Sequence, residues 1–168
     1  VYRVHDEPNQ EKVDNLRNFI SNFGYRMGPT GNGKEISKEL NALFAAAKDT
    51  PEFNAIELLS LRTMAKARYD TENLGHYGLA FKYYTHFTSP IRRYADLMVH
   101  RILSDHLEGK WTSISNLEGI CSHISETERT AMEAEMKVND LYKCHYLKNY
   151  VGCEYEGIIS GMNNAGFY

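Results

Sequence analysis

The sequence lacks the features that would place it in a membrane or outside the cell. No apolar run reaches the roughly 18 residues that a membrane-spanning helix needs, and the opening VYRVHDEPNQ does not resemble a secretory signal. The three cysteines, Cys121, Cys144 and Cys153, form no CxxC pair. An odd, scattered set favours a reducing compartment over a disulfide framework, and it argues against a thiolate metal site. We therefore expect a cytoplasmic protein with no membrane partner.

An excess of positive charge is also missing, because the formal net charge is −3. The charge is unevenly distributed, however. Residues 62–110 hold eight Lys and Arg against five Asp and Glu, which gives a local net charge of +3. A basic segment within an acidic chain is a modest electrostatic footprint for a polyanion. Ordinary surface variation explains it about as well.

The pattern of apolar residues predicts a mainly α fold with a small β component. Hydrophobic residues make up 42% of the chain, with 12 Tyr and 7 Phe, which is enough for a folded core. Helical spacing with start and stop signals predicts helices over 9–23, 37–47, about 51–66, about 90–109 and about 113–150. Residues 68–87 are predicted to be loop and short extended pieces, and the final CEYEGIISGMNNAGFY a strand, an Asn/Gly turn and the start of a second strand.

The stretch GPTGNGKE, residues 28–35, resembles a phosphate-binding loop only superficially. Its last position is Glu35, where such a loop needs Ser or Thr to hold magnesium, and no buried strand precedes it. We predict a flexible loop between two helices. Thr50-Pro51-Glu52 then looks like a helix start, with a capping hydroxyl, a proline in the first turn and an acidic residue after it.

The stretch TSPIRRYADLMVHR is the most informative part of the chain. It places two arginines at a predicted helix start, where the helix dipole disfavours cations. With Ser89 as N-cap and Pro90 in the first turn, the N–H groups of Ile91 and Arg92 would point out of the helix, a geometry that binds phosphate. Arg92 adds a planar fork that can hold a phosphate with two hydrogen bonds. We predict that Arg92 contacts a reacting phosphate.

Other residues of this predicted helix fall on two faces. Arg92, Asp96 and His100 recur every four residues, so Asp96 could orient either an arginine or His100. An exposed ladder of ion pairs would give the same spacing. The predicted core face consists of Ile91, Tyr94, Met98 and Ile102.

Aromatic side chains crowd the segment just before the two arginines. Tyr83, Tyr84, His86 and Phe87 lie beside basic residues, which suits single-stranded nucleic acid, since rings stack on bases and cations contact the backbone. The alternative is that most of these rings belong to the core. Farther on, SETERTAMEAEMK is rich in carboxylates, but their spacing fits a solvated helix face better than a metal site.

The stretch GHYGLAFKYYTHFTSPIRRYADLMVHRIL resembles the catalytic (RNB) domain of the RNase II/RNase R family of bacterial 3′-to-5′ exoribonucleases, and it is closer to RNase R. VYRVHDEPNQEKVDNLRNFI, RTMAKARYDTENLGHYGLAF and SETERTAMEAE resemble the same family in the same order. The resemblance covers residues 1–150 and identifies them as the helical C-terminal part of an α+β catalytic domain. Residues 151–168 are similar to the first strands of the family's C-terminal OB-fold, an RNA-binding domain.

The resemblance implies a function and a set of site residues. The family hydrolyses RNA with magnesium (Mg²⁺) to nucleoside 5′-monophosphates, so the expected partner is single-stranded RNA with a free 3′ end, bound by a monomer. The match places the catalytic arginine at Arg92, which would neutralise charge growing on the phosphate. Arg93 would contact the RNA backbone or brace the fold. The residues predicted to contact RNA are Tyr84, His86, Thr88, Ser89 and Arg93.

One departure from the family is informative. The family's metal site is a cluster of closely spaced aspartates upstream of this motif, whereas the aspartates here are scattered singly. The chain also begins without methionine. We therefore expect a segment of a longer enzyme, with Mg²⁺ bound by residues outside it and no activity of the segment alone. The alternatives are a non-catalytic RNA-binding module that uses the phosphate-binding helix start, and a purely structural helical domain.

Overall fold

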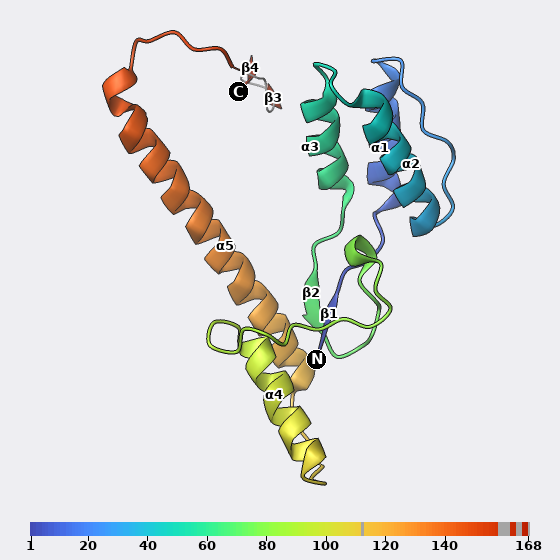
Figure 1. Cartoon of the computed structure of the whole chain (residues 1–168), viewed down its shortest axis with the longest axis vertical. Helices are drawn as coiled ribbons and strands as arrows, with labels where there is room; N and C mark the ends of the chain where they lie inside the picture. The colour runs from blue at the N-terminus through green and yellow to red at the C-terminus, as the bar shows by residue number, and fades with distance from the viewer. Residues whose placement is uncertain (112, 158–161, 164–165, 168) are drawn as a thin grey trace. The chain divides into compact units, whose positions relative to one another are not determined.

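The structure, a computed structural model, describes residues 1–111, 113–157, 162–163 and 166–167. The chain divides into two compact units. One consists of Val1–His5 and Ala67–Tyr155, and the other of Asp6–Lys66 and Glu156–Tyr168. Figure 1 shows a mainly helical chain with short strands, so the predicted fold class is confirmed. No helix within the described residues is long and apolar enough to cross a membrane.

The unit that contains Asp6–Lys66 is built on three helices, α1 (Gln10–Ser21), α2 (Gly33–Ala47) and α3 (Phe53–Thr63). Both α1 and α2 pack against α3 (Figure 1). The predicted apolar stripes supply the core, because residues at helical spacing on each helix face its neighbours. The buried core residues are Val13, Leu16, Ile20, Met27, Ile36, Leu40, Leu43, Ala47 and Ile56.

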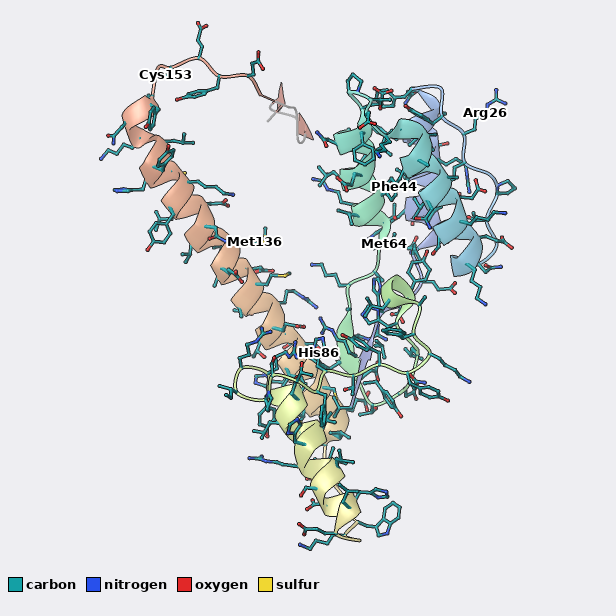
Figure 2. All side chains as sticks on the ribbon, viewed as in Figure 1. Arg26, Phe44, Met64, His86, Met136 and Cys153 are labelled. Atoms are coloured by element: carbon teal, nitrogen blue, oxygen red, sulfur yellow. The ribbon has the colours of Figure 1, made fainter. Side chains whose placement is uncertain are left out.

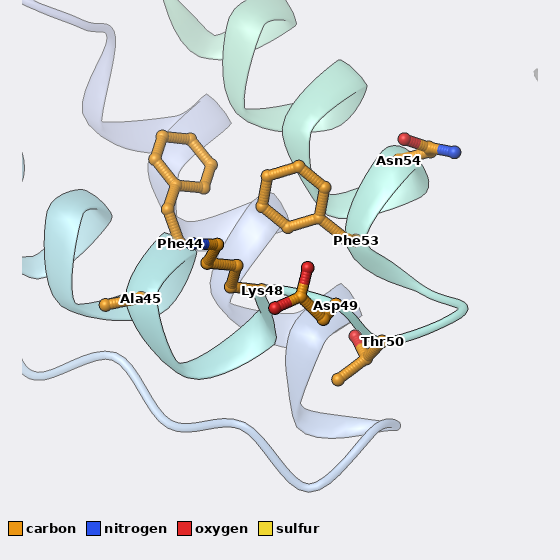
Figure 3. A pocket seen from close by; sticks show the side chains of 7 residues that line it. All are labelled: Phe44, Ala45, Lys48, Asp49, Thr50, Phe53 and Asn54. Carbon is orange, nitrogen blue, oxygen red and sulfur yellow. The ribbon is translucent and has the colours of Figure 1, made fainter.

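The predicted boundaries of α2 and α3 are wrong for identifiable reasons. Helix α2 begins four residues early because Asn32 caps it: its Oδ1 accepts the N–H of Glu35 at 3.0 Å, and the Glu35 carboxylate accepts the N–H of Gly31 at 2.7 Å. The Thr50 hydroxyl does not cap α3. It donates to the carbonyl of Ala47 at 2.6 Å and so closes the end of α2. Figure 3 shows this turn from close by.

The other unit is organised around a two-stranded antiparallel sheet. Strand β1 (Tyr2–Val4) pairs with β2 (Arg68–Asp70), with Tyr2 opposite Asp70 and Val4 opposite Arg68. The N–H of Tyr69 donates to the Ser125 hydroxyl at 2.9 Å, which ties β2 to the long helix α5 (Leu117–Leu147). The buried residues of this core are Tyr69, Ala95, Cys121 and Ile124. A 3₁₀ turn (Tyr77–Leu79) and helix α4 (Tyr94–Leu107) complete the unit, followed by a second 3₁₀ turn at Lys148–Tyr150.

Helix α5 confirms the predicted long helix but not its predicted apolar face. Among the described residues of α5 only Cys121 and Ile124 are buried. The spacing of Ile124, Val138, Leu141 and Leu147 predicts one apolar face of this helix. Val138, Leu141 and Leu147 are nevertheless half or more exposed. Met136, labelled in Figure 2, is exposed as well. Helical spacing identifies the apolar side of a helix but not what covers it.

The described residues of the C-terminal stretch form two short paired strands where the sequence predicts strands. Strands β3 (Met162–Asn163) and β4 (Gly166–Phe167) pair antiparallel. Residues 164–165, where the predicted turn falls, and residues 158–161, part of the predicted first strand, lie outside the described residues. The assignment of residues 151–168 to an OB-fold stays a prediction.

Candidate functional site

The backbone before α4 is a tight turn and not the first turn of the helix. Helix α4 begins at Tyr94, four residues after the predicted Ser89-Pro90 start. The Ser89 carbonyl accepts the N–H groups of Arg92 at 3.3 Å and Arg93 at 3.0 Å. The Ser89 N–H donates to Asp96 Oδ2 at 2.7 Å. The predicted helix start at Ser89-Pro90 is therefore wrong, because the N–H of Arg92 is used inside the turn and Ser89 is not the N-cap.

The two adjacent arginines have different environments. Arg93 is partly buried and forms a fork with Asp96, with Nε to Oδ1 at 2.9 Å and Nη2 to Oδ2 at 2.9 Å. Arg92 is exposed, and no hydrogen bond or ion pair of its guanidinium occurs with the described residues. This fork fits one of the two predicted roles of Arg93, that of bracing the fold, whereas contact with the RNA backbone stays a prediction. Arg92 is presented outward with all its side-chain donors available.

Asp96 is the carboxylate that makes this arrangement possible. Its side chain is 0% exposed, and it accepts three hydrogen bonds, two from Arg93 and one from Ser89. Burial alone would raise the pKa of Asp96, but these hydrogen bonds and the charge of Arg93 outweigh burial and hold the pKa below its ordinary value. The hydrogen bonds that Arg93 donates to Asp96 likewise raise the pKa of Arg93. Both groups of this buried pair therefore stay charged.

The other residues of the predicted α4 faces are rearranged by the late helix start. His100 does not meet Asp96; its Nε2 lies 2.7 Å from the carbonyl oxygen of Phe87, and the two rings are 4.3 Å apart. The alternative of an exposed ladder of Arg92, Asp96 and His100 therefore does not hold, and Asp96 pairs with an arginine, Arg93, which is one of the two partners expected for it. Ile91, at 102% exposure, and Tyr94, at 51%, are outside the core, whereas Met98 is buried as predicted.

His86 belongs to a chain of side chains that connects the arginine segment to β1, β2 and α5. Its Nδ1 lies 2.8 Å from the hydroxyl oxygen of Tyr69, which is buried in β2. The Arg3 guanidinium lies 4.7 Å from the centre of the Tyr69 ring and pairs with Glu128 at 2.6 Å. Figure 2 shows His86 among these crowded side chains. No sequence pattern points to Arg3, Tyr69 or Glu128, because these residues meet only through the pairing of distant segments.

Electrostatics keep His86 neutral. Burial first, and then the charges of Arg93 and Arg3, lower the pKa of His86 below its ordinary value of 6.5. Burial, and then the charge of Glu128, raise the pKa of Tyr69 above 10.0. At neutral pH the pair therefore consists of an uncharged imidazole and an uncharged phenol, which makes His86 a polar contact and not a cation.

The remaining predicted RNA contacts lie on the same segment. Tyr84 is partly buried, and its ring stands edge-on to His76 at 5.1 Å and to His86 at 5.8 Å. Thr88 is exposed and Ser89 is partly buried. The structure therefore gathers Tyr84 and His86 into one aromatic cluster and leaves Thr88 and Arg92 at the surface.

Several rings near the turn are exposed and can stack on flat ligands. Phe81, Tyr83 and Phe87 expose 43% to 65% of their surface, and the Lys82 ammonium lies 5.4 Å from the centre of the Tyr83 ring. Exposed rings beside cations are a surface that single-stranded nucleic acid can use. Among the described residues, no group of three His, Cys, Asp or Glu side chains could hold a metal ion.

Comparison with known proteins places these features in a family. The RNB domain model matches residues 1–109. A curated ribonuclease R of Aquifex aeolicus is 40% identical over 172 residues, covering 100% of this chain and 24% of that protein. The chain thus spans about a quarter of the length of the curated relatives it matches.

Solved structures agree with the sequence comparison. Mycoplasma genitalium RNase R, in complex with ribose-methylated single-stranded RNA, is 31% identical, with a TM-score of 0.85 over 99% of this chain and 27% of that one. Yeast Ssd1, described as a pseudonuclease, is 31% identical, with a TM-score of 0.59 over 73% of this chain and 16% of that one. Because the RNB model covers well over half of the residues and ribonuclease R aligns along all of them, the chain belongs to the RNB-domain family.

Proposed function

We propose that the chain is the C-terminal part of the catalytic domain of a 3′-to-5′ exoribonuclease that releases nucleoside 5′-monophosphates. In this proposal Arg92 is the catalytic arginine, and its guanidinium binds the phosphate whose bond to the next nucleotide is cleaved. A preorganised arginine stabilises the negative charge that grows on the phosphate oxygens as the bond breaks. The substrate is single-stranded RNA with a free 3′ end, and the intact enzyme acts as a cytoplasmic monomer.

The observation that carries the proposal is the contrast between the two arginines. A paired arginine stabilises a fold, and Arg93 does so through its fork with Asp96. Arg92 lies in a tight turn and is exposed, and its side chain has no partner among the described residues. An arginine with a defined backbone position and an unpaired guanidinium is well placed to bind an external anion. Ribonuclease R proteins align along the whole chain, and this supports an RNA phosphate as the anion that Arg92 binds.

The same proposal assigns the remaining contacts. Thr88 and Ser89 lie beside Arg92 in the sequence and offer small polar groups to the RNA backbone, while Tyr84 and His86 form the aromatic side of the surface. The described residues form no group of three potential metal ligands. We therefore propose that Mg²⁺ is held by residues outside this chain, and we assign it no step here.

The experiment compares Arg92→Ala with Arg101→Ala in the intact enzyme. Arg101 is also exposed, lies on α4, and has no partner among the described residues, so it controls for loss of one surface charge. We expect Arg92→Ala to lower kcat by about 10²- to 10³-fold, the usual cost of removing one preorganised donor at a developing oxyanion. The Kd for RNA, measured by fluorescence anisotropy, should change no more than about threefold. Equal losses in kcat and RNA affinity would make Arg92 a docking residue.

The second candidate is a non-catalytic RNA-binding module. The similarity to yeast Ssd1, which is described as a pseudonuclease, supports this second candidate function. A docking module needs the same exposed arginine but no turnover. Release of mononucleotides from end-labelled RNA by the intact protein separates the two, since a module binds the RNA and leaves its length unchanged.

A further inference from the structure

We infer that Asp96 is the positioning residue of Arg92, because its buried carboxylate holds both ends of the backbone turn that carries Arg92. This inference rests on the proposed function, in which Arg92 meets the reacting phosphate. It adds a residue that touches no substrate and yet sets where the catalytic arginine lies.

The first end of the turn is held through the backbone. The N–H of Ser89 donates to Asp96 Oδ2 at 2.7 Å, a short charge-assisted bond. The carbonyl of the same residue accepts the N–H groups of Arg92 and Arg93. Ser89 therefore connects the carboxylate directly to the peptide unit from which the Arg92 side chain extends.

The second end is held through a side chain. Arg93 donates from Nε to Oδ1 and from Nη2 to Oδ2 of Asp96, each at 2.9 Å. A planar guanidinium that donates two parallel bonds to a carboxylate has a fixed orientation as well as a fixed distance. Because Arg93 follows Arg92 directly, this fork restrains the backbone on the other side of the catalytic residue.

The side chain of Arg92 contributes nothing to its own placement. It is exposed, its guanidinium contacts no partner among the described residues, and its neighbour Ile91 is fully exposed as well. The place from which its side chain reaches outward is therefore set by the turn. Small displacements of a catalytic group are costly, since a shift of about 1 Å can reduce turnover about 100-fold.

The carboxylate is suited to this task by its charge and burial. Asp96 is 0% exposed, and each of its oxygens accepts at least one hydrogen bond. An amide in its place would keep the shape but would offer N–H groups where a carboxylate oxygen accepts. A role limited to stabilising α4 is the alternative, because an acidic residue in the first turn also complements the helix dipole.

The test uses three variants of the intact enzyme. Two are the single variants Asp96→Asn and Asp140→Asn, and the third combines Asp96→Asn with Arg92→Ala. Asp140 is an exposed carboxylate on α5 and controls for loss of one negative charge. We expect Asp96→Asn to lower kcat roughly 10- to 100-fold with KM for RNA changed less than about threefold. In the Arg92→Ala background it should lower kcat less than about twofold further, because a positioning residue has nothing left to position. Asp140→Asn should leave both constants unchanged.

A readout without activity separates this inference from the proposed function. In the 168-residue chain, Asp96→Asn should speed hydrogen exchange of the Ser89 and Arg92 amides at least tenfold while the α5 amides keep their rates. If Asp96→Asn fails to fold, Arg93→Lys replaces it, since lysine keeps the charge and loses the fork. It should show the same coupling to Arg92→Ala.

Three results would overturn the inference: an unchanged kcat, a kcat loss that multiplies fully onto that of Arg92→Ala, or unchanged exchange at Ser89. An Arg92→Ala enzyme with normal turnover overturns the proposed function, and the exchange of the Ser89 amide then still decides whether Asp96 holds the turn.

Discussion

Replacement of Tyr69 by phenylalanine isolates one hydrogen bond that connects the arginine segment to the sheet. The Tyr69 side chain is nearly buried, and its hydroxyl lies 2.8 Å from Nδ1 of His86. Phenylalanine keeps the ring, its packing in the core and its position under the Arg3 guanidinium. Only the hydroxyl is removed. The change in the free energy of unfolding therefore reports the lost hydrogen bond and the cost of leaving the partly buried Nδ1 of His86 without its partner.

The expected loss is about 1–2 kcal/mol, the net value of one hydrogen bond plus part of the desolvation cost of the orphaned nitrogen. Hydrogen exchange measures it locally, because the N–H of Tyr69 donates to Ser125 and the N–H of Arg3 donates to the Tyr84 carbonyl. A loss of this size should speed exchange of both amides by a factor of about 5–30.

Tyr83→Phe is the matched control. Its ring is 65% exposed, and its hydroxyl has no hydrogen bond among the described residues, so exchange should change less than about twofold. Identical exchange in the two variants would show that the contact between Tyr69 and His86 contributes nothing to stability, and it would remove the brace that we describe between β2 and the arginine segment.

Two further predictions concern pH and the helical core. The pKa values of His76 and His86 are lowered, chiefly by burial, so below their ordinary value of 6.5 the unfolded chain binds more protons than the folded chain. The contribution of these two histidines to the free energy of unfolding should be fully present above that pH and should be lost as the pH decreases through it. Urea titrations at about pH 7.5 and about pH 5.5 would detect the loss, and equal midpoints would contradict the prediction. Ile56→Ala, at a fully buried position of α3, should cost about 2–5 kcal/mol of unfolding free energy. Leu61→Ala, an exposed position of the same helix, should stay within about 0.5 kcal/mol in the same urea titration, and equal losses would show that Ile56 is not a core residue.

The sequence was sufficient where the determinants are local. The cores of α1 and α2 follow from residues three and four positions apart, and Val13, Leu16 and Ile20 are all buried as their spacing predicts. It was insufficient for strands β1 and β2. These strands have three residues each and pair Val4 with Arg68, so no local pattern reveals that they meet.

The arginine turn shows how a later residue overrides a local signal. Ser89-Pro90 has the composition of a helix start, yet α4 begins at Tyr94. The Asp96 carboxylate accepts a hydrogen bond from the N–H of Ser89, seven residues earlier, and also binds Arg93. These contacts favour a turn over a helix in the four residues between Ser89 and Tyr94. The helix-start geometry that the sequence predicts for Arg92 therefore does not occur, and its role at a phosphate stays a prediction.

The pairing of β1 with β2 has a consequence for how the chain can vary. Val4 and Arg68 are register partners, so the segment Asp6–Lys66 enters and leaves through neighbouring positions of one small sheet. A segment whose two ends are adjacent in this way behaves as an insertion. Its helices can be lengthened, shortened or exchanged over evolutionary time while the strand register, and with it the alignment of Arg3 and Tyr69, stays the same.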